Sequence, residues 1–96
     1  MMMAKVVGTV IPNQIADGVA GGRRWLLIES SDQSGKGKGE FHIALDMVEA
    51  GPNEFVLICQ GSAARQTPIT QDQPVDAIIV GIIDMIDQKE KIVYQK

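Results

Sequence analysis

The sequence predicts an all-β domain that folds as a small barrel or a sandwich. Its apolar runs are short and rich in β-branched residues, and glycine or proline turns separate them. Gly8 and Gly81 lie inside two of these runs, where a glycine marks a bulge, a bend or a close approach by another backbone. Such bends suit a closed barrel. The predicted strands are 4–11, 23–30, 40–45, 54–60 and 75–84.

The first strand ends at Pro12, and residues 14–22 are predicted to form a loop. Asp17-Gly18 is a turn signal, but the flanking strands are far apart, which favours a longer loop over a tight hairpin. The second strand contains Trp25, whose large ring we expect to pack in a core or in an interface.

Residues 31–39 predict the polar tip of a hairpin. Their glycines and lysines do not match a phosphate-binding P-loop, because that motif continues with serine or threonine and a helix, whereas a strand follows here. In the third strand, alternation places Phe41 and Ile43 on one face and His42 on the other. A lone histidine without a second histidine, a nearby cysteine or a paired acid does not predict a metal or catalytic site.

A turn region follows at 46–53. Pro52 occupies the second position of Gly51-Pro52-Asn53-Glu54, which predicts a type I turn. Cys59, in the fourth strand, is predicted to be a small buried residue, and a single cysteine cannot form an intrachain disulfide.

The chain is organised around the stretch 61–84. Its first part consists of small residues around one cation: Gly61, Ser62, Ala63, Ala64 and Arg65. We expect one short turn of helix, in which Ser62 accepts a hydrogen bond from a free amide and Gly61 allows a sharp turn. The side chain of Arg65 could reach a carbonyl, a carboxylate or a partner subunit.

The second part, 75–84, is apolar on both faces and predicts a fifth strand covered on both sides. One face could serve the core and the other a neighbouring subunit. Before it, Pro68 and Pro74 bracket a polar link, and Pro74 is expected to hold Gln73 extended. Residues 91–94 are a last short strand, which we expect to pair within the subunit or with a neighbour.

Asp76 and Asp84 flank the apolar run. They are eight positions apart, or roughly 26 Å along an unbent strand, so they cannot form a catalytic pair. We expect each to bond to turn amides or to a neighbouring chain.

Length, charge and missing motifs exclude several classes of function. The 96 residues fit a single domain, 1–96, that oligomerisation would help to stabilise. A net charge of −3 argues against a nucleic-acid surface, and no run approaches the roughly 20 apolar residues that cross a bilayer. No paired-carboxylate, Cys/His or Ser-His-Asp pattern is present, so we predict no enzyme, no metal and no cofactor.

Segments 61–65 and 74–84 resemble the pentameric shell proteins of bacterial microcompartments, a family that includes the carboxysome vertex protein and its ethanolamine and propanediol relatives. The resemblance continues, in the family's order and spacing, at 4–10, 26–28, 44–46 and 50–51. The family usually has glycine where this chain has Glu49 and Asn53. Asparagine tolerates a left-handed backbone well, whereas glutamate does so poorly.

The resemblance implies an OB-like barrel of five strands, with one short helix between the fourth and fifth strands and a short C-terminal strand. It implies a homopentamer in the bacterial cytoplasm that joins hexameric shell proteins and caps the vertices of a polyhedral shell. It places Gly61, Ser62 and Ala63 near the ring axis, where bulky side chains of five copies would collide. Interface or structural roles are expected for Arg65, Asp76, Gly81 and Asp84.

Two alternatives remain open at this point. OB-like barrels also bind single-stranded nucleic acid, although only 4% of these residues are aromatic, which leaves few platforms for stacked bases. An axial pore lined by Gly61 and Ser62 could favour small anions through its backbone amides. The sequence contains no motif for the enclosed enzymes, so the type of compartment stays open.

Overall fold

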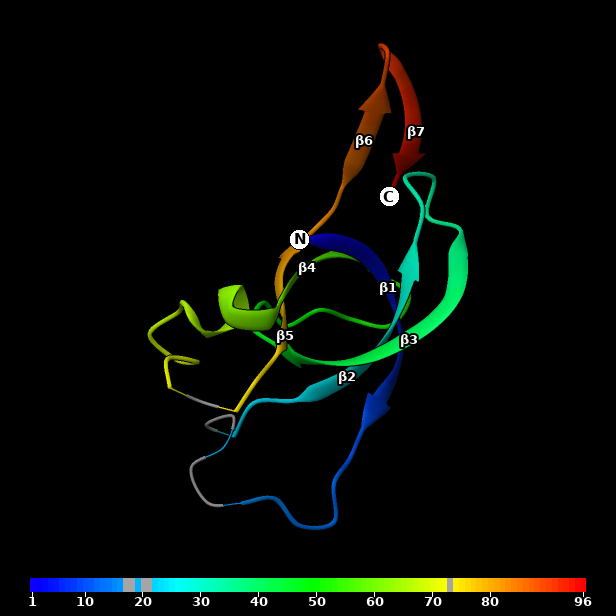
Figure 1. Ribbon diagram of the computed structural model, residues 1–96. Coiled ribbons are helices and arrows are strands. Elements are labelled where there is room, and N and C mark those ends of the chain that lie inside the picture. Colours follow the sequence, from blue (N-terminus) through cyan, green and yellow to red (C-terminus); the bar gives the residue numbers. More distant parts are fainter. Residues whose placement is uncertain (17–18, 20–21, 73) are drawn as a thin grey trace.

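The computed structural model describes residues 1–16, 19, 22–72 and 74–96. Five strands close into a barrel in the order β1-β2-β3-β5-β4, and two more form a separate hairpin (Figure 1). The strands are β1 (Met2–Val10), β2 (Trp25–Ser31), β3 (Gly37–Asp46), β4 (Phe55–Gln60), β5 (Ala77–Ile82), β6 (Met85–Gln88) and β7 (Lys91–Gln95). A 3-10 helix, η2 (Gly61–Arg65), connects β4 to the segment before β5. The predicted all-β, OB-like barrel with one short helix is therefore confirmed.

Both interior glycines mark bulges, as predicted. The pairing of β1 with β2 shifts register between Val6 and Gly8. The pairing of β4 with β5 shifts between Leu57 and Ile58, where Leu57 lies opposite Gly81. Bulges bend a strand and increase its twist, which helps a small sheet to close on itself.

Buried apolar side chains form two clusters on the barrel sheet. The first fills the barrel interior and includes Leu26, Ile28, Val56, Ile58 and Ile79. The second lies on the other side of β5, where Ile78 packs with Leu45, Ala64 and Val75. The prediction that β5 is covered on both faces is confirmed. At Ile78, however, the cover comes from η2 and residue 75 of the same chain, not from a neighbouring subunit.

Two local predictions were wrong. Asn53 has φ 65° at the third position of its turn, which belongs to type II and not to type I. Cys59 is half-buried at the second cluster instead of buried. Glu49 has φ 58°, so this glutamate adopts the left-handed backbone that its side chain disfavours.

The β2–β3 connection is a hairpin tip, as predicted, but β3 begins at Gly37, three residues earlier than expected. The Asp32 carboxylate organises the tip by accepting hydrogen bonds from the hydroxyl and amide of Ser34 and the amide of Lys36. The Ser34 hydroxyl is the main cause of a lowered pKa at Asp32. The predictions for Asp17-Gly18 and Gln73 lie outside the described residues.

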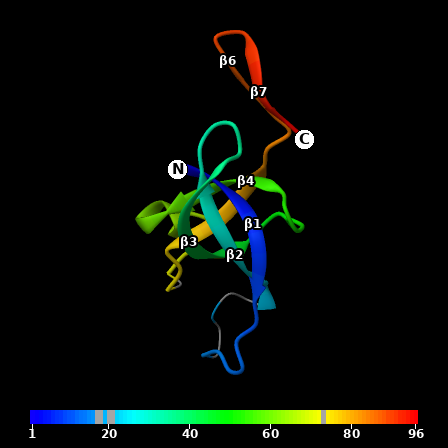
Figure 2. The same cartoon turned by 90° about the vertical axis from the view of Figure 1, so that its right-hand side faces the viewer.

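The last strand pairs within the subunit, with β6, a strand that the sequence reasoning missed. Lys89 and Glu90 form the connecting turn with φ 52° and 66°, the two positive values that a type I′ hairpin turn requires. The hairpin projects from one end of the barrel, and residues 11–16, which follow β1, extend from the opposite end (Figures 1 and 2). In the described part of the chain, no helix has the length and hydropathy that crossing a bilayer requires.

Candidate functional site

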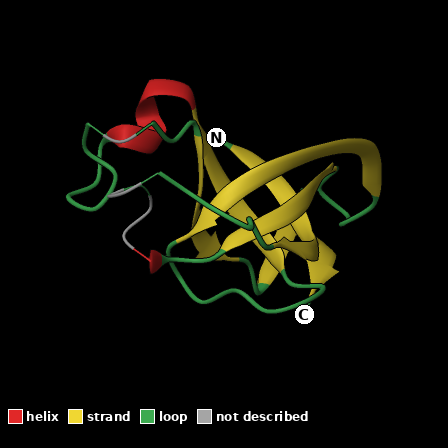
Figure 3. Cartoon of the chain, turned by 90° about the horizontal axis from the view of Figure 1, so that it is seen from below, coloured by secondary structure: helices red, strands yellow, loops and turns green. Residues whose placement is uncertain are grey.

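The short helix η2 lies on the outside of the barrel (Figure 3). Gly61 has φ 63°, which lets the chain turn from the end of β4 into η2 without strain from a side chain. Its amide donates to the Asp76 carbonyl at 2.8 Å. The predicted capping role of Ser62 was wrong, because Gln60 is the N-cap residue and no side chain caps the helix. Gly61, Ser62 and Ala63 are all exposed.

A buried threonine attaches η2 to the chain that follows it. Thr70 is completely buried, and its hydroxyl donates to the Ala64 carbonyl at 2.6 Å. The same residue's amide donates to the Thr67 hydroxyl at 3.0 Å. The sequence reasoning missed this anchor. The Thr67-x-x-Thr70 spacing, typical of a local hydroxyl-to-amide turn, was the available signal.

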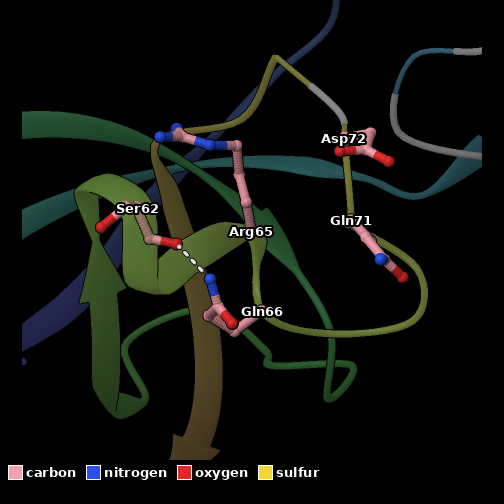
Figure 4. Close-up of a pocket in the computed structure, with 5 residues that line it drawn as sticks. All are labelled: Ser62, Arg65, Gln66, Gln71 and Asp72. Atoms are coloured by element: carbon pink, nitrogen blue, oxygen red, sulfur yellow. Dashed lines mark hydrogen bonds between the residues drawn. The ribbon is translucent and has the colours of Figure 1, made fainter.

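Arg65 closes η2 and lines a polar depression of about 400 Å³ together with Ser62, Gln66, Gln71 and Asp72 (Figure 4). Its Nη1 donates to the Val75 carbonyl at 3.2 Å. Figure 4 shows the guanidinium turned away from Gln71 and Asp72. Among the described residues, Arg65 forms no ion pair with a carboxylate.

A second depression, of about 450 Å³, has a different lining. Its residues come from β2, β3 and the adjoining ends of β4 and β5: Leu27, Phe41, His42, Ile43, Gln60, Asp76 and Ala77. Phe41 is 57% exposed and Ile43 50%, so the predicted shared face of these side chains points away from the core. The carboxylate of Asp76 is exposed and accepts no hydrogen bond from the described residues.

The structure separates the predicted site residues into two groups. The η2 residues and Asp76 lie together, because Gln60 at the end of β4 pairs with Ala77 at the start of β5. Gly81 lies farther along β5 in its bulge, and the exposed Asp84 follows the end of that strand. The Asp84 carbonyl accepts the Lys96 amide at 2.8 Å. Within the described residues, no three His, Cys, Asp or Glu side chains gather as metal ligands would.

A buried carboxylate, also missed from the sequence, fixes the turn after β3. Asp46 is 4% exposed and accepts hydrogen bonds from Arg24 Nη2 at 2.8 Å, the Ala50 amide at 3.1 Å and the Val48 amide at 3.2 Å. Burial raises the pKa of Asp46, but these bonds together outweigh it and leave the pKa lowered. These hydrogen bonds hold the turn in which Glu49 adopts its left-handed backbone.

Comparison with known proteins identifies the family. The family model described as "Ethanolamine utilisation protein EutN/carboxysome" matches residues 1–84. The carboxysome shell vertex protein CcmL of Synechococcus elongatus is 38% identical, over 100% of this chain and 96% of that protein.

Solved structures similar to this chain belong to the same family. CcmL of Nostoc sp. PCC 7120 has a TM-score of 0.91 at 39% identity, with complete coverage of both chains. The GrpN pentameric microcompartment shell protein of Rhodospirillum rubrum has a TM-score of 0.81 at 30% identity, covering 92% of this chain and 99% of that one. These relatives support the shell-protein hypothesis and not the nucleic-acid alternative. The chain belongs to the EutN/carboxysome family.

Proposed function

We propose that this chain is a structural subunit of a bacterial microcompartment shell, in which five copies form a ring that occupies a vertex. The observation that carries the proposal is the similarity over the full chain, in sequence and in fold, to carboxysome shell vertex proteins. A flat lattice of hexameric tiles cannot close into a body by itself. Five-fold units inserted where facets meet provide the missing curvature, and this task requires shape and edge contacts but no reaction.

The exposed face of η2 is suited to a ring axis. A cyclic ring uses a head-to-tail interface, in which one surface of each subunit meets a different surface of the next. Gly61, Ser62 and Ala63 are exposed and small, so five copies can approach closely. Ala64 points into the second cluster instead and supports η2 from beneath.

The remaining site residues have roles near that axis or within the subunit. Arg65, the last residue of η2, and Asp76, whose carbonyl accepts the Gly61 amide, form no ion pair with another described residue and serve the interface. Gly81 is structural, because its bulge shapes the barrel, and Asp84 marks the point where the chain leaves it. The partners of the ring are hexameric shell proteins, and its location is the shell of a microcompartment in the bacterial cytoplasm.

The test is co-expression of hexameric shell proteins with and without this chain, followed by electron microscopy. We expect closed polyhedra only when the chain is present, and open sheets or tubes without it. Ala63→Trp places a bulky ring on the exposed face of η2 and should also prevent closure. Lys91→Trp, a matched change on the exposed hairpin, should not. Equally frequent closed shells without the chain would contradict the proposal.

A further inference from the structure

One strand edge of the barrel lacks a pairing partner among the residues that the structure describes. β3 pairs along its length with β2, but its parallel pairing with β5 involves only Leu45 and Asp46. In the described residues, the stretch from Gly37 to Ala44 therefore has one free edge. Two apolar side chains on this stretch are exposed, Phe41 to 57% and Ile43 to 50%. An exposed, apolar strand edge promotes association, and native proteins usually cover such an edge.

Each of the two depressions beside η2 contains a charged group that could pair with one in the other. The depression at the β3 edge contains the exposed carboxylate of Asp76, together with His42 and the apolar side chains. Arg65 lines the other depression together with Asp72, from which its guanidinium points away (Figure 4). Neither Arg65 nor Asp76 forms an ion pair with another described residue. The two depressions share no lining residue, so one subunit presents two distinct surfaces next to the same helix.

Arg65 is suited to a partner carboxylate. Its guanidinium has five N–H donors, and one nitrogen is used by the Val75 carbonyl. Half-burial of the side chain reduces the water available to the remaining donors. A carboxylate from a second copy would satisfy them, because a guanidinium and a carboxylate form short, charge-assisted hydrogen bonds.

We propose that Arg65 of one subunit pairs with Asp76 of the next, and that the same contact covers the β3 edge. The partner is a second copy of this chain, whose η2 side packs over Phe41 and Ile43. This inference rests on the proposed ring and specifies its contact. A head-to-tail ring requires two different surfaces on each subunit. In each contact, the depression with Arg65 on one subunit would meet the depression with Asp76 on the next. Their position beside η2 agrees with an axis at that helix.

Charge reversal tests the pair. The variants are Arg65→Glu, Asp76→Arg and the double variant, each compared with the unmodified chain by native mass spectrometry over a dilution series. Each single change puts like charges together, so the concentration at which half of the chains are in rings should rise at least about tenfold. The double variant restores opposite charges at every contact and should return within about threefold of the original value.

Matched controls exclude a general effect of charge. Arg23→Glu and Asp87→Arg make the same two reversals at exposed positions away from η2, and they should leave ring formation unchanged. Phe41→Glu is a second variant that does not involve Arg65 or its bond to Val75. It places a charge in the covered surface, so it should also dissociate the ring while circular dichroism shows a folded subunit.

The outcomes are distinguishable. If the unmodified chain forms rings and Arg65→Glu, Asp76→Arg and Phe41→Glu form them equally well, this inference is wrong and the ring proposal stands. Single variants that dissociate without recovery in the double variant would also overturn the pairing. If the unmodified chain forms no ring at any concentration, the proposed function itself fails.

Discussion

The barrel and the C-terminal hairpin are both built from antiparallel strands, yet different interactions stabilise them. Barrel strands bury at least one face, so that side chains such as Ile28, Val56 and Ile58 are completely inaccessible. No residue of β6 or β7 is buried. The comparison shows that the barrel is stabilised by its own interior, whereas the hairpin depends on a few contacts at its base, since an isolated two-stranded ribbon is marginal in water.

Side-chain and backbone contacts connect the hairpin to the rest of the subunit. The rings of Phe55 and Tyr94 meet edge to face with centroids 4.5 Å apart. At the base, Lys96 Nζ lies 2.6 Å from Glu54 Oε2, and the Lys96 amide donates to the Asp84 carbonyl at 2.8 Å. Nearer the turn, Gln33 Nε2 donates to Gln88 Oε1 at 3.1 Å. The match to the family model ends at residue 84, where the barrel ends and the hairpin begins. The barrel therefore accounts for the part of the fold that the family model describes.

The largest difference between the two regions should appear when the same isoleucine-to-alanine change is made in each. Ile58 is 0% exposed inside the barrel, and Ile92 is 58% exposed on the hairpin. Ile58→Ala should lower the free energy of unfolding by about 2–5 kcal/mol, because it removes buried methyl groups and leaves a cavity. Ile92→Ala should change it by less than about 0.5 kcal/mol. Urea unfolding followed by Trp25 fluorescence measures both free energies of unfolding. Equal losses in the two variants would show that the barrel and the hairpin are not stabilised differently.

A smaller loss of stability is expected within the barrel region when the buried carboxylate of Asp46 is removed. Asp46→Ala leaves the amides of Val48 and Ala50 without their acceptor, which should lower the free energy of unfolding by about 1–3 kcal/mol. Calorimetry or urea unfolding at neutral pH checks this loss.

The pH dependence of the same residue follows from its lowered pKa. A carboxyl whose folded pKa is depressed stabilises the fold above its unfolded pKa, about 3.9, and this stabilisation disappears as the pH falls through the folded value. The stability difference between the unmodified chain and Asp46→Asn should thus shrink on acidification below about pH 4. A difference that stays constant down to pH 2 would show that ionisation of Asp46 is not involved.

At the hairpin base, the aromatic contact should have a local effect. Tyr94→Ala removes the edge-to-face contact with Phe55, a type of pair that contributes about 0.5–1.5 kcal/mol beyond burial. Amide hydrogen exchange should accelerate in β6 and β7 and remain unchanged in β1 to β5. Tyr94→Phe keeps the ring and serves as the control. Acceleration throughout the barrel would mean that the hairpin belongs to the same cooperative unit.

The smallest expected effect is that of the terminal ion pair. The hydrogen bond with Lys96, followed by that from the Gly51 amide, lowers the pKa of Glu54, and Glu54 raises the pKa of Lys96. The pair is therefore formed between the ordinary pKa values of the two groups, and it is lost through acidification at Glu54 or strong alkali at Lys96.

Lys96→Met should leave global unfolding unchanged, because exposed pairs contribute little, and should accelerate exchange only near the hairpin base. Salt should produce the same local effect in the unmodified chain and none in the variant. A salt response that persists in Lys96→Met would rule out this pair as its source.

The sequence predicted the parts of the fold that local patterns determine. β-branched runs indicated the five barrel strands, and Gly8 and Gly81 indicated the bulges. β6 was missed because Met85-Ile86-Asp87 is too short and mixed to show alternation, and a strand of this kind forms only when β7 pairs with it. The pair of Arg24 and Asp46 was missed because the two residues are 22 positions apart, and only barrel closure brings them together.

For the candidate site, the sequence indicated the right segment but not its contacts. The small residues of η2 were recognisable, whereas the cover of β5 by Ala64 and Val75 depends on how the link folds back. The free edge of β3 could not be foreseen either, since it results from the short parallel pairing with β5.

Native mass spectrometry of the purified chain tests the central claim most directly. A vertex subunit should give a ring with five times the 10.4 kDa mass of one chain, and dilution should convert it to single subunits without other stable species. A chain that remains a single subunit at high concentration, or that forms a closed ring of another size, would contradict the account.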